Sequence, residues 1–369
     1  MKICITRSTK YSYSETFIRD QIAGFAKVSD VYPIHSGRYP ERKEDGSLLG
    51  PKLFWFLHKA FKIILGRNNY FSNYGVEKFL KENEIDVVLS NYGTSGAHMV
   101  SVCKSLKIPL LVIFHGHDAT DRKLLKEYKG KYRKLFEYAA YLIVVSKDMK
   151  KKLIALGADP KKIHVIPCGV DVLKFTPSKN KIRDKNFLAV GRFAPKKAPL
   201  FTLQAFYKVL QKYPEATLTM VGKKQGLFNE CEAFVNKLGI QKSVIFTGVL
   251  GQTEIGELIN KSFAFVQHSV TAPNGDMEGT PVSIMEASAC GLPIVSTFHG
   301  GIQDAVIHEK TGFLVDEMDV EKMANYMIYF CENHKQANNL GLKGCEHIKE
   351  NYNQVTQLQK IYKLAKESF

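Results

Sequence analysis

The sequence lacks an apolar run approaching the roughly 20 residues that a membrane-spanning helix needs. Its seven cysteines show no metal-ligand spacing, so we expect buried free thiols in a reducing compartment. The apolar start is too short for a signal peptide; we expect residues 1–6 to form a strand and the protein to be cytoplasmic. No internal repeat or low-complexity tract is present. These absences leave an ordinary globular protein.

Acidic residues are comparatively few, with 36 Asp and Glu against 52 Lys and Arg and a net charge of +16. Such a surplus suits nucleic acid, an anionic membrane surface or a phosphorylated substrate. No nucleic-acid-binding signature is present, so we expect no nucleic-acid partner. Most lysines are spread along helical segments, as on a solvated surface.

A length of 369 residues suits two α/β domains better than one core. Short apolar runs alternate with stretches of helical periodicity, which predicts doubly wound parallel sheets covered on both faces. The predicted strands are 85–89, 110–114, 141–145, 163–166, 187–190, 217–221, 244–246, 264–266 and 294–296. A polar, turn-prone segment at 176–181 separates predicted domains 1–175 and 176–350. We expect a final helix over 351–369 to return to the first domain.

The most informative segment is 274–287, which reads NGDMEGTPVSIMEA. Thr280 before Pro281 predicts a helix start, with a capping hydroxyl and then proline at the first helical position. Gly279 permits a ligand to approach the backbone closely. The unpaired N–H groups of the first turn, from Val282 and Ser283, would bind phosphate.

Two glutamates flank this helix start. Glu286 lies more than a turn inside the helix, where its carboxylate suits vicinal hydroxyls such as those of a ribose. Glu278 lies in the preceding loop, where it suits sugar hydroxyls. A nucleotide-sugar needs this layout around a cradled diphosphate, although two exposed glutamates beside an ordinary helix would have the same spacing.

In its context this segment resembles the Glu-x7-Glu signature of the retaining glycosyltransferase family four. The similarity includes 291–295 (GLPIV), 300–302 (GGI) and 311–315 (TGFLV). Residues 274–279 are especially similar to exopolysaccharide enzymes of the colanic-acid and amylovoran type. The resemblance covers 141 to about 315 well and the N-terminal half only in patches. It implies an α/β GT-B fold, in which two Rossmann-like doubly wound domains face across a cleft.

A second site follows the strand 187–190, where Arg192 and Lys197 lie on the loop after Gly191. Two cations there would neutralise a diphosphate leaving group. The resemblance assigns both side chains to the donor diphosphate. Lys196 competes with Lys197, but its spacing from Arg192 is less favourable, and a solvated basic loop is the alternative interpretation.

A third site is 114–118 (FHGHD), directly after a predicted strand. His-x-His-Asp is compatible with zinc or with a structural histidine. The resemblance implies instead that His115 contacts the donor sugar and that Asp118 supports the loop on the donor side, without a metal.

Smaller signals agree with a nucleotide-sugar site. The loop with Gly248 and Val249 resembles the one that faces the nucleotide base, and Gly222 ends another strand on the same rim. Each is also an ordinary turn. No Asp-x-Asp metal clamp is present, so we expect neither a metal nor any cofactor besides the donor. Residues 7–18 (RSTKYSYSETFI) replace the Gly-Gly loop of many relatives, and we expect them to meet the acceptor.

Residues 52–67 (KLFWFLHKAFKIILGR) would form a basic amphipathic helix. Such a helix can lie on an anionic membrane or pack on the first domain's sheet. The resemblance favours a membrane, because related enzymes extend lipid-linked oligosaccharides. We therefore expect a protein that binds peripherally to the inner face of the plasma membrane.

The function predicted from these residues is a retaining, metal-independent hexosyltransferase of cell-surface polysaccharide synthesis. A UDP-hexose is the favoured donor, and a glycan or lipid-linked oligosaccharide is the acceptor. Two alternatives remain open: a GT-B epimerase or phosphorylase, and a non-catalytic module that binds polyanions through the charge of +16.

Overall fold

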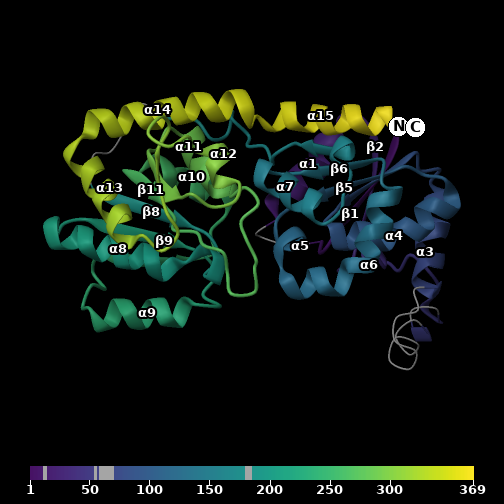
Figure 1. The fold of residues 1–369 in the computed structure, drawn as a ribbon, viewed down its shortest axis with the longest axis horizontal. Coiled ribbons are helices and arrows are strands. Elements are labelled where there is room, and N and C mark those ends of the chain that lie inside the picture. Colours follow the sequence, from purple (N-terminus) through teal and green to yellow (C-terminus); the bar gives the residue numbers. More distant parts are fainter. Residues whose placement is uncertain (11–14, 54–55, 58–69, 179–184) are drawn as a thin grey trace. The chain divides into compact units, whose positions relative to one another are not determined.

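The computed structural model describes residues 1–10, 15–53, 56–57, 70–178 and 185–369 (Figure 1). The chain forms two compact units, the first comprising Met1–Pro167 with Val355–Phe369 and the second comprising Cys168–Gln354. Each unit is an α/β sandwich built on its own sheet, which confirms the predicted doubly wound architecture.

The described part of the first unit contains a seven-stranded sheet in the order β3-β2-β1-β4-β5-β6-β7, parallel except for the β2–β3 pair. Its central strands β4 and β5 are buried along their whole length, as expected for a sheet covered on both faces. The strands are β1 (Lys2–Arg7), β2 (Asp30–His35), β3 (Arg42–Lys43), β4 (Val87–Asn91), β5 (Leu110–Phe114), β6 (Tyr141–Val144) and β7 (Ile163–Val165).

The helices described in this unit are α1 (Thr16–Phe25), α3 (Tyr70–Glu82), α4 (Gly93–Leu106), α5 (His117–Thr120), α6 (Arg122–Tyr138), α7 (Lys147–Ala155) and the terminal α15 (Gln354–Glu367). Helix α15 packs beside α1, where the rings of Tyr362 and Phe25 lie 6.3 Å apart. The Tyr362 hydroxyl also donates to the Val28 carbonyl over 3.3 Å. The C-terminal segment is therefore part of the first unit.

The described part of the second unit contains a six-stranded parallel sheet in the order β10-β9-β8-β11-β12-β13. Its strands are β8 (Asn186–Val190), β9 (Thr217–Val221), β10 (Val244–Gly248), β11 (Ala264–Val266), β12 (Ile294–Thr297) and β13 (Phe313–Val315). Its helices are α8 (Pro199–Lys212), α9 (Phe228–Lys237), α10 (Gln252–Asn260), α11 (Val282–Ala289), α12 (Ile302–Ala305), α13 (Val320–Glu332) and α14 (His334–Asn351).

Two hydrophobic clusters cover the two faces of this second sheet. Because successive strand side chains alternate between faces, Phe187 of β8 packs with α8, α9 and α13, and Leu188 packs with α11 and α12. Figure 1 shows α8 and α9 on one side of the sheet and α11 and α12 on the other. Every strand thus ends at one rim, and the loops that leave the rim carry the candidate site.

The structure divides the chain before Cys168 and not after residue 175 as the sequence suggested. The reason is that Val170 pairs with the segment before α15, donating to the Tyr352 carbonyl over 2.8 Å and accepting from the Gln354 N–H over 3.0 Å. Phe175 is buried in the second unit's core. These contacts attach the segment to the second unit.

Candidate active site

The loop between β11 and α11 carries Glu278, and the helix begins one residue later than predicted. Helix α11 starts at Val282, with the extended Pro281 as its N-cap (ψ 114°) and Thr280 one residue before the cap. Pro281 contributes the first helical acceptor, because its carbonyl accepts from the Ile284 N–H over 3.2 Å. The N–H groups of Val282 and Ser283 still have no carbonyl inside the helix to bond, so anion binding at this end stays a prediction.

Glu278 and Lys197 form a buried ion pair at the centre of the site. Lys197 Nζ lies 3.3 Å from Glu278 Oε2, and the side chains are only 14% and 8% exposed. The other carboxylate oxygen, Oε1, is buried without a hydrogen-bond partner among the described residues. A buried polar atom without a partner is costly, and a hydroxyl of a bound ligand would satisfy it.

Opposing influences set the protonation of this pair. Burial would raise the pKa of Glu278, but attraction from Lys197 and Lys196 lowers it overall. Burial lowers the pKa of Lys197, and the Glu278 carboxylate opposes that shift. A carboxylate with lowered pKa beside an amine is an ionised acceptor suited to sugar hydroxyls.

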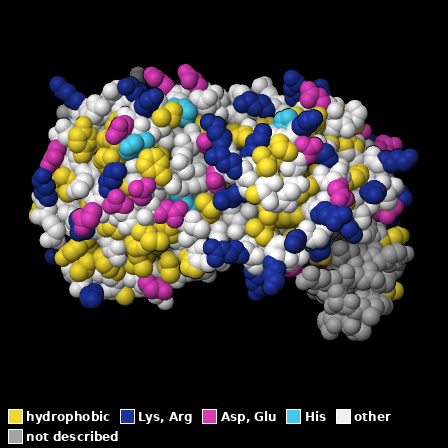
Figure 2. All heavy atoms as spheres, viewed as in Figure 1, with side chains coloured by type: hydrophobic (Ala, Val, Ile, Leu, Met, Phe, Trp, Pro, Cys, Tyr) yellow, Lys and Arg dark blue, Asp and Glu magenta, His cyan; other side chains and the backbone are white. Residues whose placement is uncertain are grey.

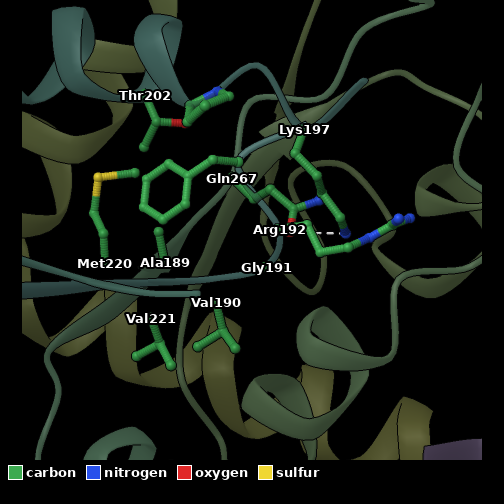
Figure 3. Close-up of a pocket in the computed structure, with 11 residues that line it drawn as sticks. Ala189, Val190, Gly191, Arg192, Lys197, Thr202, Met220, Val221 and Gln267 are labelled. Carbon is green, nitrogen blue, oxygen red and sulfur yellow. Dashed lines mark hydrogen bonds between the residues drawn. The ribbon is translucent and has the colours of Figure 1, made fainter. Parts of the chain in front are cut away.

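Arg192 and Lys197 line the same hollow at the carboxyl end of β8 (Figure 3). Lys197 Nζ donates to Gln267 Oε1 over 3.4 Å, and Gln267 Nε2 donates to Ser269 Oγ over 2.8 Å. Arg192 is exposed and lies two residues after the end of β8. The two cations therefore share one pocket, as binding of a diphosphate requires.

The neighbouring Lys196 has a structural role. Its Nζ donates to Asp276 Oδ1 over 3.0 Å and to the Met277 carbonyl over 3.1 Å, so it holds the loop that precedes Glu278. The two adjacent lysines therefore have different roles, because Lys197 points into the pocket and Lys196 into the loop.

The glycine-bearing ends of β8, β9 and β10 meet on one rim. Gly191 N–H donates to the Val221 carbonyl and Gly222 N–H to the Gly248 carbonyl, each over 2.9 Å. A Cβ at Gly222 would lie 2.1 Å from the Gly191 carbonyl oxygen, so only glycine permits this approach. Val249 follows Gly248 and is half-exposed. A flat ligand group could therefore contact the backbone here.

Glu286 occupies the middle of α11 and is 7% exposed. Within the second unit, the structure thus brings Arg192 and Lys197 into one pocket, pairs Lys197 with Glu278, and places Glu286 on the helix that follows. A buried carboxylate on that helix is chemically suited to the paired hydroxyls of a ribose.

His115 and Asp118 lie in the first unit, after β5. Asp118 Oδ1 accepts from the N–H groups of His115 and Gly116, both over 3.0 Å, and Oδ2 accepts from Gly93 N–H over 2.7 Å, so Asp118 holds the loop. His115 Nε2 lies 3.0 Å from Asn91 Oδ1. Burial lowers the pKa of His115 to about 3, so its imidazole is neutral at pH 7.

The described residues contain no group of three or more His, Cys, Asp or Glu side chains placed to hold a metal ion. His117, the other histidine of the FHGHD segment, lies 3.9 Å from Asp121 on the exposed side of α5. His115 instead bonds Asn91, so the two imidazoles serve different contacts.

Three residues of this region were not predicted from the sequence: Gln267, His299 and Glu317. Gln267 bonds Lys197, and His299 accepts from the Glu278 N–H over 3.0 Å while bonding Glu317 over 2.6 Å. Gln267 and His299 each follow a buried strand closely, and that position was the available signal.

Two protein-family models match consecutive parts of the chain. The model described as Glycosyltransferase Family 4 matches residues 16–173, and the model described as Glycosyl transferases group 1 matches residues 174–347. Together they span both units.

Among curated proteins, the chain is similar to the amylovoran biosynthesis glycosyltransferase AmsK of Erwinia amylovora. The two are 31% identical over 251 residues, which are 66% of this chain but only 60% of the relative. A UDP-Gal:alpha-D-GlcNAc-diphosphoundecaprenol alpha-1,3-galactosyltransferase of Escherichia coli is 28% identical over 307 residues, covering 77% of this chain and 76% of that one.

Solved structures share the fold. HepE of Anabaena, crystallised with UDP-glucose, superposes with a TM-score of 0.79 at 18% identity over 100% of both chains. Sucrose-phosphate synthase of Thermosynechococcus elongatus gives 0.78 at 18% identity over 100% of this chain and 98% of that one. The two family models match consecutive parts of the chain, and the solved structures share its two-sheet fold. The chain therefore belongs to glycosyltransferase family 4 and has the GT-B fold.

Proposed function

We propose that this protein is a retaining, metal-independent hexosyltransferase that uses a nucleotide-sugar, with a UDP-hexose as the favoured donor. The observation that carries the proposal is the Lys197–Glu278 pair with its unpartnered carboxylate oxygen, in a loop beside the cationic pocket of Arg192. This arrangement offers cations to a diphosphate and an acceptor atom to a sugar hydroxyl.

Each side chain then has one role. Arg192 and Lys197, together with the N-terminus of α11, stabilise the departing diphosphate. Their positive charge replaces the charge that a metal would supply. Glu286 binds the ribose hydroxyls and Glu278 binds the hexose. Neutral His115 is assigned to the donor sugar from family membership. Retention of the anomeric configuration is proposed from family membership.

The choice of UDP-hexose rests on relatives. The E. coli galactosyltransferase carries UDP-Gal in its name, and HepE was crystallised with UDP-glucose. A mannosyltransferase of Corynebacterium glutamicum, 25% identical over 295 residues, is named as GDP-mannose-dependent. The base and the sugar must therefore be distinguished by experiment.

A glycan or lipid-linked acceptor at an anionic membrane fits the charge distribution. The first unit holds 32 of the 52 Lys and Arg but 17 of the 36 Asp and Glu, so it carries nearly all of the net charge of +16. Figure 2 shows these cations spread over its visible face. None of the helices in the described ranges is long and apolar enough to cross a membrane. The segment 52–67 lies mostly outside the described residues, so its membrane contact stays a prediction.

Donor binding tests the proposal. Calorimetry with UDP, GDP, ADP and their hexose conjugates, all in EDTA, should show one series binding to the wild type and failing with Glu286→Ala. Transfer then needs an acceptor. Donor turnover without one would indicate an epimerase, and dependence on phosphate a phosphorylase. If no nucleotide binds and Glu286→Ala leaves polyanion binding unchanged, the non-catalytic alternative replaces the proposal.

Flotation with anionic liposomes at physiological salt tests the membrane part. We expect the wild type to float and the double variant Lys126→Gln/Lys129→Gln, on the exposed face of α6, to float less. The matched control is Lys237→Gln/Lys242→Gln, which removes two exposed charges from the second unit. Wild-type protein that stays in the soluble fraction, or equal loss with both pairs, would contradict peripheral binding.

A further inference from the structure

The loop after β12 fixes the peptide groups on both sides of Glu278. The Glu278 N–H donates to His299 Nε2 over 3.0 Å. The next residue, Gly300 (φ +47°), approaches so closely that a Cβ there would lie 2.2 Å from the Glu278 carbonyl oxygen. The position of the Glu278 carboxylate therefore depends on residues 299–300 as well as on its own loop.

This contact dictates which nitrogen of His299 carries the proton. Because Nε2 accepts from a backbone N–H, the proton must be on Nδ1. Nδ1 lies 2.6 Å from Glu317 Oε1, which accepts that proton's hydrogen bond. The His299 side chain is 0% exposed, so water does not compete for either nitrogen.

Glu317 is itself held in place as an ionised acceptor. It accepts from Thr271 N–H over 2.8 Å and from the Thr271 hydroxyl over 3.2 Å. Burial alone would raise the pKa of Glu317, but the bonds from Thr271 and His299 lower it overall. The adjacent Met318 N–H donates to His268 Nε2 over 2.8 Å, which anchors the Glu317 loop.

We infer that His299 is a positioning residue for sugar transfer: it holds the Glu278 peptide so that the carboxylate meets the donor hexose, and Glu317 selects the imidazole tautomer that can do so. The inference rests on the proposed function, in which Glu278 binds the hexose. The imidazole acts on the hexose through Glu278 and leaves the nucleotide contacts of Glu286 untouched.

Two substitutions of similar size separate this role from general packing. In His299→Gln the side-chain amide oxygen reaches the position of Nε2 and can accept from the Glu278 N–H. In His299→Asn the amide reaches only the position of Nδ1 and loses that bond. We expect His299→Asn to lower kcat on the order of 100-fold, the size of effect that a 1 Å misplacement can produce. His299→Gln should recover most of it.

Three further readouts locate the effect. Affinity for the bare nucleoside diphosphate should be unchanged in both variants, which also shows that they are folded. In a Glu278→Ala background, His299→Asn should cause no further loss, because the two residues act as one unit. Glu317→Ala should also lower kcat, as His299→Asn does, since the imidazole proton of His299 can then move to Nε2. Glu317 is 28% exposed, so this variant keeps the test available if His299→Asn does not fold.

The outcomes are distinguishable. If the wild type transfers sugar and the kcat of both His299→Asn and Glu317→Ala equals that of the wild type, the inference is overturned and the proposed function stands. The same holds if His299→Gln is as impaired as His299→Asn. A wild type that transfers no sugar removes the proposed function. The tautomer of His299 gives an independent test, read by 15N NMR of histidine-labelled protein. Nδ1–H in the wild type and its loss in Glu317→Ala support the inference, and Nε2–H in the wild type overturns it.

Discussion

Replacing Lys197 by methionine should separate the stability of the site from its activity. The substitution keeps the aliphatic stem and removes the charge that lies 3.3 Å from Glu278. At an effective dielectric constant of about 20, unit charges at that distance attract by about 5 kcal/mol, part of which offsets desolvation. Removing one partner of a buried pair typically costs about 3–5 kcal/mol. We expect Lys197→Met to lower the free energy of unfolding by about 3 kcal/mol, because the nearby charge of Lys196 still attracts the orphaned carboxylate.

The double variant Lys197→Met/Glu278→Gln gives the decisive comparison. It removes both charges, so most of the lost stability should return, whereas sugar transfer should stay abolished. The effect should also depend on pH. In the wild type the lowered pKa of Glu278 contributes stability above the unfolded pKa, and this is lost as pH falls through the folded pKa. The deficit of Lys197→Met should therefore shrink toward pH 4.

Urea denaturation from pH 4 to 8, with a transfer assay beside it, measures these effects. Lys208→Met is the matched control, because Lys208 pairs with Glu321 on the surface and its loss should cost less than about 1 kcal/mol. The reasoning is refuted if Lys197→Met costs no more than Lys208→Met, or if the double variant is as unstable as Lys197→Met alone.

Three further changes give separate expectations. Gly300→Ala places a Cβ against the Glu278 carbonyl at a positive φ, and should lower both the melting temperature and transfer; an unchanged melting temperature would contradict the close approach. Arg192→Ala removes an exposed cation, so calorimetry should show about tenfold weaker nucleoside diphosphate binding, with unfolding altered by less than about 0.5 kcal/mol. His115 has a pKa of about 3 when folded and about 6.5 unfolded, so only the unfolded chain takes up this proton in between. That difference costs up to about 1.4 kcal/mol per pH unit as pH falls, and urea titrations of His115→Gln should show a shallower decline than the wild type.

The sheet strands were largely predictable because they are buried on both faces. The apolar runs at 110–114, 217–221 and 264–266 coincide with β5, β9 and β11. Strand β2 was missed because it contains Pro33, and a proline argues against a strand in a sheet. The strand tolerates Pro33 because the ladder to β3 pairs only Ile34 and His35, which leaves Pro33 outside it.

The site was predictable where chemistry is local and not where it is made by tertiary contacts. The spacing from Arg192 favoured Lys197 over Lys196, and in the structure only Lys197 faces Glu278 as an ion pair while Lys196 holds the loop. The start of α11 was misplaced by one residue because proline is most common at the first helical position, whereas Pro281 here is extended and forms the N-cap. His299 and Glu317 contact the Glu278 loop from segments distant in the chain, and a single sequence does not show which distant residues come into contact.

The central claim is that the Glu278 carboxylate binds the hexose of a nucleotide-sugar. Its most direct test is a calorimetric comparison of the wild type and Glu278→Gln, each titrated in EDTA with a nucleoside diphosphate and then with its hexose conjugate. The account predicts equal affinity of both proteins for the diphosphate and a loss of affinity for the hexose conjugate in Glu278→Gln alone. Identical affinities of the two proteins for the hexose conjugate would contradict it.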